Sequence, residues 1–295
     1  MNIKTNLKNF IPLLAIPAAM LVPQIGGILS PFTSWILGGL LFFAFLGLEP
    51  KKVFKELRKP MQAFYMSMVV LVITPMVILP VMHYFFPNYQ LGALLFMLMP
   101  SAISAPAIAG IYGGSVALAS VNTVLSNLLS PFTIPILIGF FAGGAVKVSL
   151  FKILSQLLIL MVTPFLLSLV AHHFAEDTIK KAKSHFGLIA LGLLFLLFFA
   201  ALSPYKAELI SNLLNGSLWL AVLIAHLILF FFAKLMVAHV KVKQDRVSIQ
   251  SNIMFLNVGL AIVIAQSYFG PQEILFIIFC QISWVILVGL FKYLK

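Results

Sequence analysis

The stretch MPSAISAP, residues 99–106, places two prolines and two serines in the middle of an apolar run that extends from about residue 90 to about residue 112. A proline removes one backbone donor and clashes with the preceding helical turn, so a helix through this stretch should be interrupted. Inside a bilayer, non-helical backbone is tolerated only where it is buried in protein or lines a water-filled cavity. The stretch therefore predicts a broken membrane helix beside a functional cavity.

A second interruption is expected near the C-terminus. QSN at residues 250–252 and NVG at residues 257–259 place amides, a hydroxyl and a glycine inside an apolar run at residues 247–269. Interrupted segments in corresponding positions of two halves of a chain are the best sequence indication of a transporter's binding site. A purely structural kink in each helix is the alternative interpretation of the same residues.

The composition points to a membrane for the whole chain. Of 295 residues, 62% are hydrophobic and 9% are charged, whereas soluble domains carry about 25% charged residues. The net charge of +12 does not indicate a nucleic-acid partner, because the basic residues form short clusters between apolar spans. The single cysteine, Cys280, has no partner for a disulfide and no metal-ligand spacing. We expect the lipid bilayer as the solvent, with no nucleic acid, no cofactor and no resident metal ion.

The apolar runs predict an all-α membrane protein of about ten transmembrane helices. Their expected ranges are residues 9–29, 33–49, 61–86, 90–112, 114–143, 150–174, 185–204, 210–238, 247–269 and 272–293. Alternating these spans across the membrane puts 16 of the 19 Lys and Arg residues on one side, which the positive-inside rule makes cytoplasmic. The expected topology is a multi-pass inner (plasma) membrane protein with both termini in the cytoplasm.

A weak internal repeat divides the chain in two. GLLFFAFLGLEP at residues 39–50 is similar to GLLFLLFFAALSP at residues 192–204, and each lies in the second helix of its half. Because five helices is an odd number, the second half must be inverted relative to the first, as in many transporters. The predicted units are residues 1–145 with helices 1–5 and residues 146–295 with helices 6–10.

The candidate binding residues come from the two breaks and from one polar stripe. Thr123, Asn127 and Ser130 recur at helical spacing on one face of the fifth helix. Asparagine inside a membrane helix marks a functional interior or serves as interhelical glue. The predicted substrate or ion contacts are Ser101, Ser104, Thr123, Asn127, Asn252 and Asn257.

Titratable groups are scarce inside the predicted spans. No aspartate or glutamate lies within a predicted helix core, so a carboxylate relay for protons is not expected. His226 is the one titratable group deep in a span, which makes it a possible proton site. A lone membrane histidine is more often a structural hydrogen-bonder, and that interpretation stays open beside the first.

Segments over nearly the whole chain resemble the bile acid:sodium symporter family. The similarity lies in the second helix, the broken fourth helix, the fifth helix and single positions of helices eight to ten. The matching segments are LFFAFLGL at residues 41–48, GSVAL at residues 114–118, LLSPFTIP at residues 128–135 and NVGLA at residues 257–261, together with His226 and Trp284.

The resemblance implies an architecture and an activity. Helices 3–5 and 8–10 would form a core, with helices 1, 2, 6 and 7 as a panel beside it. A small organic anion would bind in the crevice between them, near the two crossing discontinuous helices 4 and 9. The implied activity is secondary-active transport by alternating access, and not enzyme catalysis.

The chain departs from the family pattern where sodium should bind. The family's Ser-Asn pair at the first break corresponds to Ala105 and Pro106, and a serine early in the fifth helix corresponds to Ala119. The family's glutamate and glutamine in the ninth helix correspond to Asn252 and Leu256. A sodium ion in a low-dielectric interior needs several oxygen ligands and a countercharge. We therefore expect the sodium site to be altered or absent.

Other function classes remain as alternatives. A carrier of the auxin-efflux type shares the crossed broken helices, and an ion-independent uniporter or exchanger would need no ion site. A membrane sensor or enzyme is disfavoured, because the interior offers hydroxyls and one isolated histidine but no nucleophile with a base. A channel is disfavoured because no filter motif is present.

Overall fold

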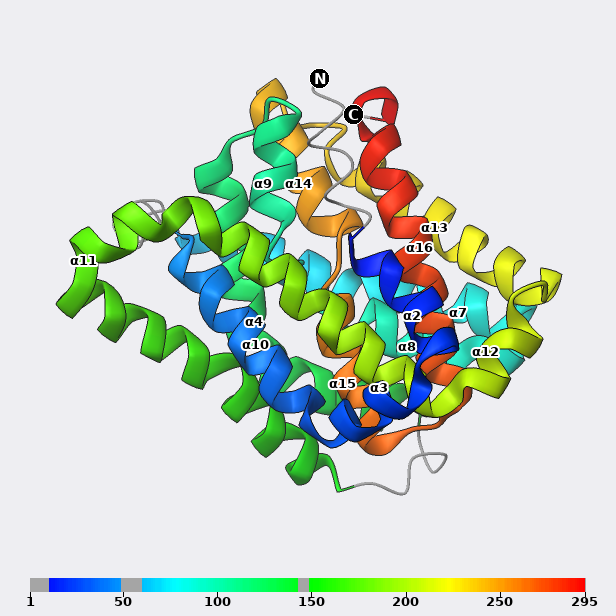
Figure 1. The fold of residues 1–295 in the computed structure, drawn as a ribbon. Helices are drawn as coiled ribbons and strands as arrows, with labels where there is room; N and C mark the ends of the chain where they lie inside the picture. The colour runs from blue at the N-terminus through cyan, green and yellow to red at the C-terminus, as the bar shows by residue number, and fades with distance from the viewer. Residues whose placement is uncertain (1–10, 49–59, 143–148, 295) are drawn as a thin grey trace.

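The computed structural model describes residues 11–48, 60–142 and 149–294, and its regular structure there is helical throughout (Figure 1). Six helical stretches of this part are long and apolar enough to cross a membrane. They are Pro23–Leu46, Phe64–Phe85, Val116–Ala142, Leu150–Asn212, Gly216–Met236 and Pro271–Phe291. The basic residues Lys4, Lys8 and Lys147 and the basic loop at residues 51–59 lie outside the described residues.

The first half of the chain holds the first broken helix. In order it contains η1 (Ile11–Leu14), α2 (Ala15–Leu21), α3 (Pro23–Leu29), η2 (Ser30–Phe32), α4 (Thr33–Leu46), α6 (Pro60–Met68), η3 (Val69–Ile73), α7 (Thr74–Phe85), η4 (Pro87–Tyr89), α8 (Gln90–Met97), α9 (Ala105–Ile111) and α10 (Val116–Ala142). Between α8 and α9 lies a non-helical segment, residues 98–104, which we call the first break.

The second half holds the other broken helix. In order it contains α11 (Leu150–Leu202), η6 (Ser203–Tyr205), α12 (Lys206–Asn212), α13 (Gly216–Met236), α14 (Lys243–Met254), α15 (Val258–Tyr268) and α16 (Pro271–Leu294). Residues 255–257 separate α14 from α15, and we call them the second break. The structure thus interrupts the first helix within the predicted stretch and the second helix at Asn257, whereas residues 250–252 lie within α14 and do not interrupt it.

The predicted first helix, residues 9–29, is divided. Val22 has φ −131° and ψ 56°, which ends α2 one residue before Pro23 starts α3. The residue before a proline is biased away from the α conformation, because the proline ring clashes with it. Pro23 itself is well placed at the first position of α3, where its missing N–H is not needed.

The predicted helices 150–174 and 185–204 correspond to the two arms of α11, which meet at a kink at Ala175, but residues 176–184 between them are helical and not a loop. This helix has 53 residues, a path of roughly 80 Å at 1.5 Å per residue. It bends at Ala175, with φ −137° and ψ 33°, and its two arms form the V at the left of Figure 1. The Nζ atom of Lys180 lies 3.0 Å from the Glu176 carboxylate one turn earlier, a spacing that supports a helix.

The helices form two layers that contact each other chiefly through α10 and α11 and through α15. α4 packs along α11 and, together with α2 and α3, these helices make the layer that we call the panel. α8, α9, α10, α14, α15 and α16 make the opposing layer, which we call the core side. A Cβ on Gly92 would lie only 2.7 Å from the Phe276 Cβ. The absence of a side chain at Gly92 therefore lets α8 approach α16 closely.

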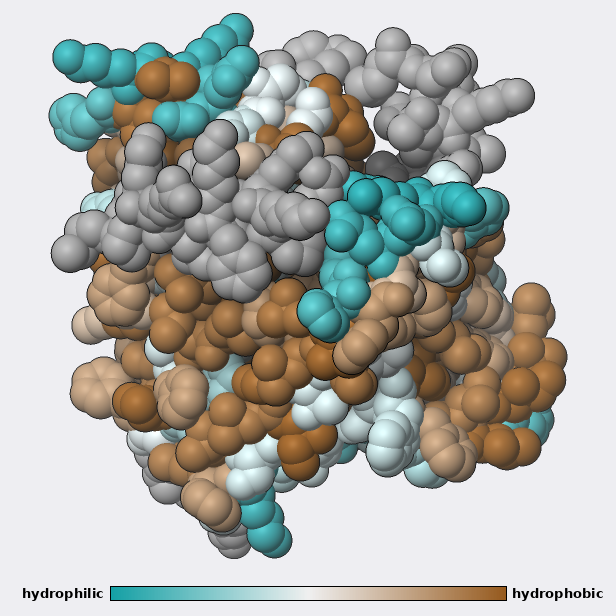
Figure 2. Space-filling view, turned by 90° about the vertical axis from the view of Figure 1, so that its left-hand side faces the viewer, coloured by the Kyte–Doolittle hydropathy of each residue, from teal (hydrophilic) through white to brown (hydrophobic). Residues whose placement is uncertain are grey.

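The outer surface is apolar over a broad band. Figure 2 shows hydrophobic side chains across the middle of one face, with hydrophilic side chains gathered above them. Large apolar side chains such as Leu21, Phe151 and Phe174 are exposed. A soluble protein rarely exposes so continuous an apolar surface, so this band is the lipid-facing belt of a membrane-embedded, multi-pass protein.

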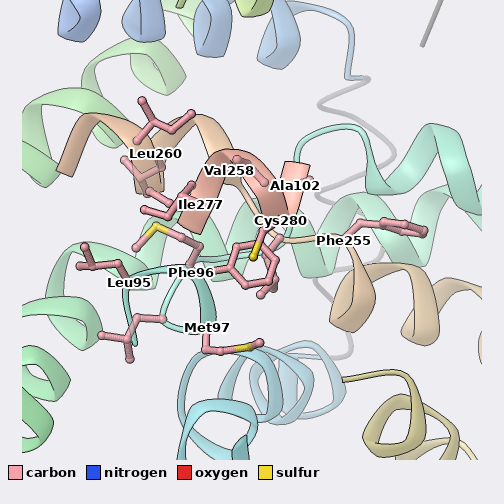
Figure 3. Close-up of a cluster of buried hydrophobic side chains, with 14 of the residues drawn as sticks. Leu95, Phe96, Met97, Ala102, Phe255, Val258, Leu260, Ile277 and Cys280 are labelled. Carbon is pink, nitrogen blue, oxygen red and sulfur yellow. The ribbon is translucent and has the colours of Figure 1, made fainter. Parts of the chain in front are cut away.

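Apolar side chains also fill the interior around the two breaks (Figure 3). They come from α8, α15, α16 and the breaks themselves, and each is buried. The labelled members are Leu95, Phe96, Met97, Ala102, Phe255, Val258, Leu260, Ile277 and Cys280. This packing fixes the non-helical backbone in one position and sets the geometry of the site beside it.

Candidate functional site

The two breaks pair with each other through their backbones. The N–H of Ala102 donates to the carbonyl of Phe255 at 2.7 Å, and the N–H of Asn257 donates to the carbonyl of Pro100 at 2.8 Å. These bonds satisfy backbone groups that each helix leaves open where it is interrupted. Two segments more than 150 residues apart therefore form one crossing point.

A fully buried polar network lies behind this crossing. The Oγ of Ser101 donates to the carbonyl of Asn252 at 2.8 Å. The Nδ2 of Asn127 donates to the carbonyls of Ser101 and Thr123, at 2.9 Å and 2.7 Å. The Nδ2 of Asn252 donates to the Oγ1 of Thr123 at 2.9 Å. All four residues are 0% exposed, so the network joins α10 to the first break and to α14 without contact with solvent.

Asn257 connects this network to the open side of the crossing. Its Nδ2 lies 3.4 Å from the Oδ1 of Asn127, and its Oδ1 accepts from the N–H of Leu260 at 3.1 Å. The second bond caps the N-terminus of α15, where helical N–H groups have no partner of their own. Both the nitrogen and the oxygen of the Asn257 carboxamide thus have partners within the protein.

A cavity of about 650 Å³ opens beside the crossing, between the panel and the core side. The panel contributes α4 from Leu40 to its end and α11 from Lys183 to Leu194. The core side contributes both breaks and the facing turns of α9, α10, α15 and α16. Most of the lining is apolar, and its polar members are Ser104, Ser120, Lys183, Asn257, Gln281 and Trp284. This volume suits an organic molecule of drug-like size.

The predicted site residues fall into two groups. Ser104 and Asn257 line the cavity. Ser101, Thr123, Asn127 and Asn252 belong to the buried network, and the structure does not place them in the cavity wall. The sequence could predict that these residues share a region, but helical spacing gives no depth.

His226 lies apart from both groups. It is buried in α13, and its Nδ1 lies 2.8 Å from the carbonyl of Val222, one turn earlier in the same helix. Its ring packs 5.4 Å from the ring of Phe96. Among the described residues, nothing pairs with its Nε2. A role for His226 in proton transfer stays a prediction, because this geometry provides no partner that would exchange a proton with it among the described residues.

The lining also contains residues that the sequence analysis missed. Lys183 was counted there only as a topology charge, yet it lines the cavity from the panel. Gln281 lines it from α16, although it is only 4% exposed. A glutamine in the middle of an apolar membrane helix is itself a signal of a functional interior, and that signal was available.

The donor set can be tested against the sodium site that the family resemblance implies. Ala105 and Pro106 offer no side-chain oxygen, and the Oγ1 of Thr123 already accepts from Asn252. The Oδ1 of Asn252 is the one oxygen of the network that is buried without a hydrogen-bond partner among the described residues. One neutral oxygen does not make a sodium site, because the ion needs several ligands to offset its desolvation. The residues present do not fit the ion, and we derive no transport step through it.

A comparison of the sequence with models of known protein families identifies a family of membrane transporters. The model of the SBF-like CPA transporter family matches residues 10–286, which is nearly the whole chain. This match confirms the resemblance to the bile acid:sodium symporter family that the sequence segments indicate. No curated protein matches the chain.

Proposed function

The chain belongs to the SBF-like CPA transporter family, and on that premise we propose that it carries a small organic anion across the membrane by alternating access. The observation that carries the proposal is the cavity of about 650 Å³ between the panel and the crossing of the two breaks. Sites built at paired interrupted helices are the recurring solution of secondary transporters.

The charge around the cavity favours an anion. Lys183 is the charged residue of its lining among the described residues. The N-terminus of α15 also borders the cavity through Val258 and Gly259. A helix N-terminus carries a partial positive charge, so both features stabilise a negative group.

Closure at the opposite end supports alternating access. Three consecutive residues at the end of α15 hydrogen-bond to the panel, and we call this contact the seam. The bonds are Gln266 Nε2 to Ser30 Oγ at 2.5 Å, Gln156 Nε2 to Ser267 Oγ at 3.1 Å and Tyr268 OH to the Lys152 carbonyl at 3.2 Å. α4 and α15 each run from the seam at one end to the cavity at the other, and α11 starts at the seam and reaches the cavity beyond its kink. This arrangement corresponds to a transporter open to one side and closed to the other.

The proposal includes the topology. The cavity is lined by Lys183 of the basic stretch at residues 180–183, so it faces the cytoplasm of an inner (plasma) membrane protein whose two termini are both cytoplasmic. Residues 1–145 and 146–295 are then two inverted five-helix repeats in a ten-helix protein. Reporter fusions ending at Pro271 and at Lys295 should report opposite sides, and a C-terminus outside the cytoplasm contradicts the ten-helix topology.

Sodium has little part in the proposed cycle. The network supplies one uncommitted oxygen and no countercharge, which supports transport as a uniporter or an exchanger. Uptake into proteoliposomes should be compared with an inward sodium gradient, an inward proton gradient and no ion gradient. Strong saturable stimulation by sodium alone contradicts sodium independence, and a proton response lost in His226→Gln assigns coupling to that histidine.

A thermal-shift screen of organic anions and matched neutral analogues on the purified protein tests the substrate class. A ligand that binds the folded protein stabilises it by its binding free energy. We expect anions to raise the melting temperature and their neutral analogues to leave it unchanged. Stabilisation by neutral or cationic solutes alone contradicts the assignment to an anion.

A further inference from the structure

A second pocket opens at the seam end of the molecule, opposite the cavity. Its volume is about 360 Å³, which lies within the range of sites for small organic molecules. The first turn of α16 and the end of η4 form one wall, and α12 with the turn that leads to α13 forms the other. Only residues 269 and 270 separate the start of α16 from the end of α15 in the seam. We call this space the seam pocket.

The seam pocket lies between parts of both layers. α12 packs on α2 of the panel, whereas η4 packs on α8 and α16 of the core side. Hydrogen bonds already link the two walls, because the Nδ2 of Asn215 donates to the Oδ1 of Asn212 at 2.9 Å and to the hydroxyl of Tyr89 at 3.3 Å. A ligand in the seam pocket would therefore contact a helix of each layer.

The amide nitrogens that line the seam pocket already donate within the protein. Besides the Nδ2 of Asn215, the Nδ2 of Asn212 donates to the backbone carbonyl of Glu208 at 2.9 Å. The Nε2 of Gln272 donates to the carbonyl of Asn88 at 2.7 Å, which joins α16 to η4. The polar groups that remain for a ligand are therefore chiefly acceptors.

These acceptors include one negative charge. Among the described residues, nothing forms an ion pair with the carboxylate of Glu208, which lines the pocket from α12. The Oε1 of Gln272 likewise accepts no hydrogen bond from the described part of the chain, and the oxygen of Tyr89 has a second lone pair. A positive group with several N–H donors suits this set, and an ammonium group has three such donors.

A divalent metal ion suits the pocket less well. Calcium takes about six to eight oxygen ligands, several of them usually carboxylates, and Glu208 brings the one carboxylate of the described lining. The apolar side chains of Leu218, Pro271 and Leu275 complete the wall. Apolar surface beside a single charge favours an organic cation with a short hydrocarbon part, because hydrocarbon gains free energy on leaving water.

We propose that the seam pocket binds the primary ammonium group of a small organic cation through Glu208, Gln272 and Tyr89, and that this ligand holds the seam closed by joining the two layers. The pocket is separate from the cavity, so binding there does not depend on the proposed function. The effect on the seam rests on the alternating access proposed above. A ligand that binds one conformation more tightly shifts the population toward that conformation.

Trp219 provides a binding signal beside the seam pocket, because its Nε1 donates to the carbonyl of Leu213 in the turn between α12 and α13. The chain has three tryptophans, so the double variant Trp35→Phe/Trp284→Phe leaves Trp219 as the fluorescent reporter. The protein in lipid nanodiscs is titrated at constant ionic strength with n-butylammonium, tetramethylammonium, n-butanol and calcium chloride. Tetramethylammonium carries the charge without N–H donors, and n-butanol carries the chain without the charge. Thermal shifts of the protein with all three tryptophans give a second measurement.

We expect saturable binding of n-butylammonium in the millimolar range and no saturable signal from the other three probes. Glu208→Gln should weaken this binding about fivefold, the effect of one exposed charge pair, and Glu208→Asp should keep most of it. The control is Glu273→Gln, because the Glu273 carboxylate accepts from the N–H of Gly270 and does not line the pocket. Each variant is compared with its own ligand-free state, since Glu208 also lies in the first turn of α12, where a carboxylate stabilises the helix.

The effect on the seam is measured with Ser30→Cys in a Cys280→Ala background, because Ser30 contacts Gln266 across the seam. An anionic methanethiosulfonate reagent labels this thiol when the seam opens. Saturating n-butylammonium should slow the labelling about threefold by favouring the closed seam. The additional change Glu208→Gln should remove this slowing at the same concentration.

The opposite outcomes overturn the inference in distinct ways. Equal binding of n-butylammonium and tetramethylammonium, or binding of calcium alone, overturns the assignment to an ammonium group. Binding of n-butylammonium that is unchanged in Glu208→Gln overturns the assignment of the site. Binding that leaves the labelling of Ser30→Cys unchanged overturns the joining of the two layers. Each of these results leaves the assignment of the cavity to an organic anion standing, because the screen of anions tests that assignment separately.

Discussion

At one end of α4 the panel and the core side are separated by a cavity, and at the other end of the same helix they touch. The cavity end is lined by apolar side chains with Lys183 among them. At the seam end, two of the three hydrogen bonds join polar side chains to each other, and the third joins the Tyr268 hydroxyl to a backbone carbonyl. A neutral hydrogen bond contributes only about 1 kcal/mol net, so the seam can open at modest cost.

Between the two ends lies a thin apolar contact. A Cβ on Gly259 would lie 3.2 Å from a methyl carbon of Leu197 and 3.3 Å from one of Leu37, both on the panel. The absence of a side chain on Gly259 lets α15 approach the panel this closely. The buried network of the breaks, by contrast, lies within the core side and shares no atom with the panel. In the proposed alternating-access cycle, the interface would therefore be the part that opens and closes, and the crossing of the breaks would move as one body.

Locking the seam should have the largest effect. In a Cys280→Ala background, Ser30→Cys with Gln266→Cys should be joined by a short crosslinker that attaches to both thiols through disulfide bonds, since these side chains are in contact. We expect transport to fall below about 5% of the uncrosslinked level and to return on reduction, because the two layers can no longer separate. The matched control is Gly39→Cys with Leu193→Cys, two facing positions within the panel, since a Cβ on Gly39 would lie 3.7 Å from a methyl carbon of Leu193. Full transport with the seam crosslinked contradicts alternating access across it.

Adding a side chain at Gly259, where α15 contacts the panel between the two ends, should have the next largest effect. Gly259→Val places methyl groups against Leu197 and Leu37, so the panel cannot close on α15 and transport should fall about tenfold. Gly192→Val is the control, because a Cβ there meets open space. Proteoliposome uptake at matched protein levels measures both. Equal uptake in the two variants removes Gly259 from the closing contact.

Weakening the buried network should reduce transport more than expression. Thr123→Val removes the acceptor of the Asn252 amide, and Asn257→Leu removes the cap of α15. Each change should cost roughly 1–2 kcal/mol of stability and lower transport several-fold. Thr133→Val is the control, since its hydroxyl reaches the Ser130 carbonyl only at 3.5 Å. If Thr123→Val and Asn257→Leu both transport normally, the site lies elsewhere.

The charge at the cavity end should have the smallest effect. Lys183→Gln should raise the KM for an organic anion about threefold, because an exposed charge contributes less than about 1 kcal/mol. The maximal rate should change little. The effect should shrink as salt is added, since exposed charges are screened. Lys181→Gln, an exposed neighbour that does not line the cavity, is the control. An equal change in both variants indicates general surface charge instead of a binding contact.

The sequence predicted the breaks because the signal there is local. Two prolines in residues 99–106 and a glycine beside Asn257 disfavour a continuous helix wherever the chain folds. The continuity of α11 was not predictable in the same way. Its charged stretch from Glu176 to Lys183 has the composition of a loop, and its helix is stabilised by the Lys180–Glu176 pair and by packing of Ile179 and Phe186 on the panel.

The division of the site residues was also out of reach of the sequence. Thr123 and Asn252 are 129 positions apart, and only the crossing of the breaks brings the two side chains together. The resemblance to a family placed them near an ion site, yet their side chains bond to each other. Gln281 shows the opposite case, because a single polar residue in an apolar helix was visible and its place beside the cavity was not.

The long helix α11 acts as a lever. Its first turns carry Lys152 and Gln156 at the seam, and its second arm carries Lys183 at the cavity, with Ala175 as the only residue inside it that leaves the helical conformation. The same helix thus takes part in both ends of the interface between the panel and the core side. In the proposed cycle, a movement of its first arm at the seam would displace Lys183 as well, to an extent set by the stiffness of the elbow at Ala175.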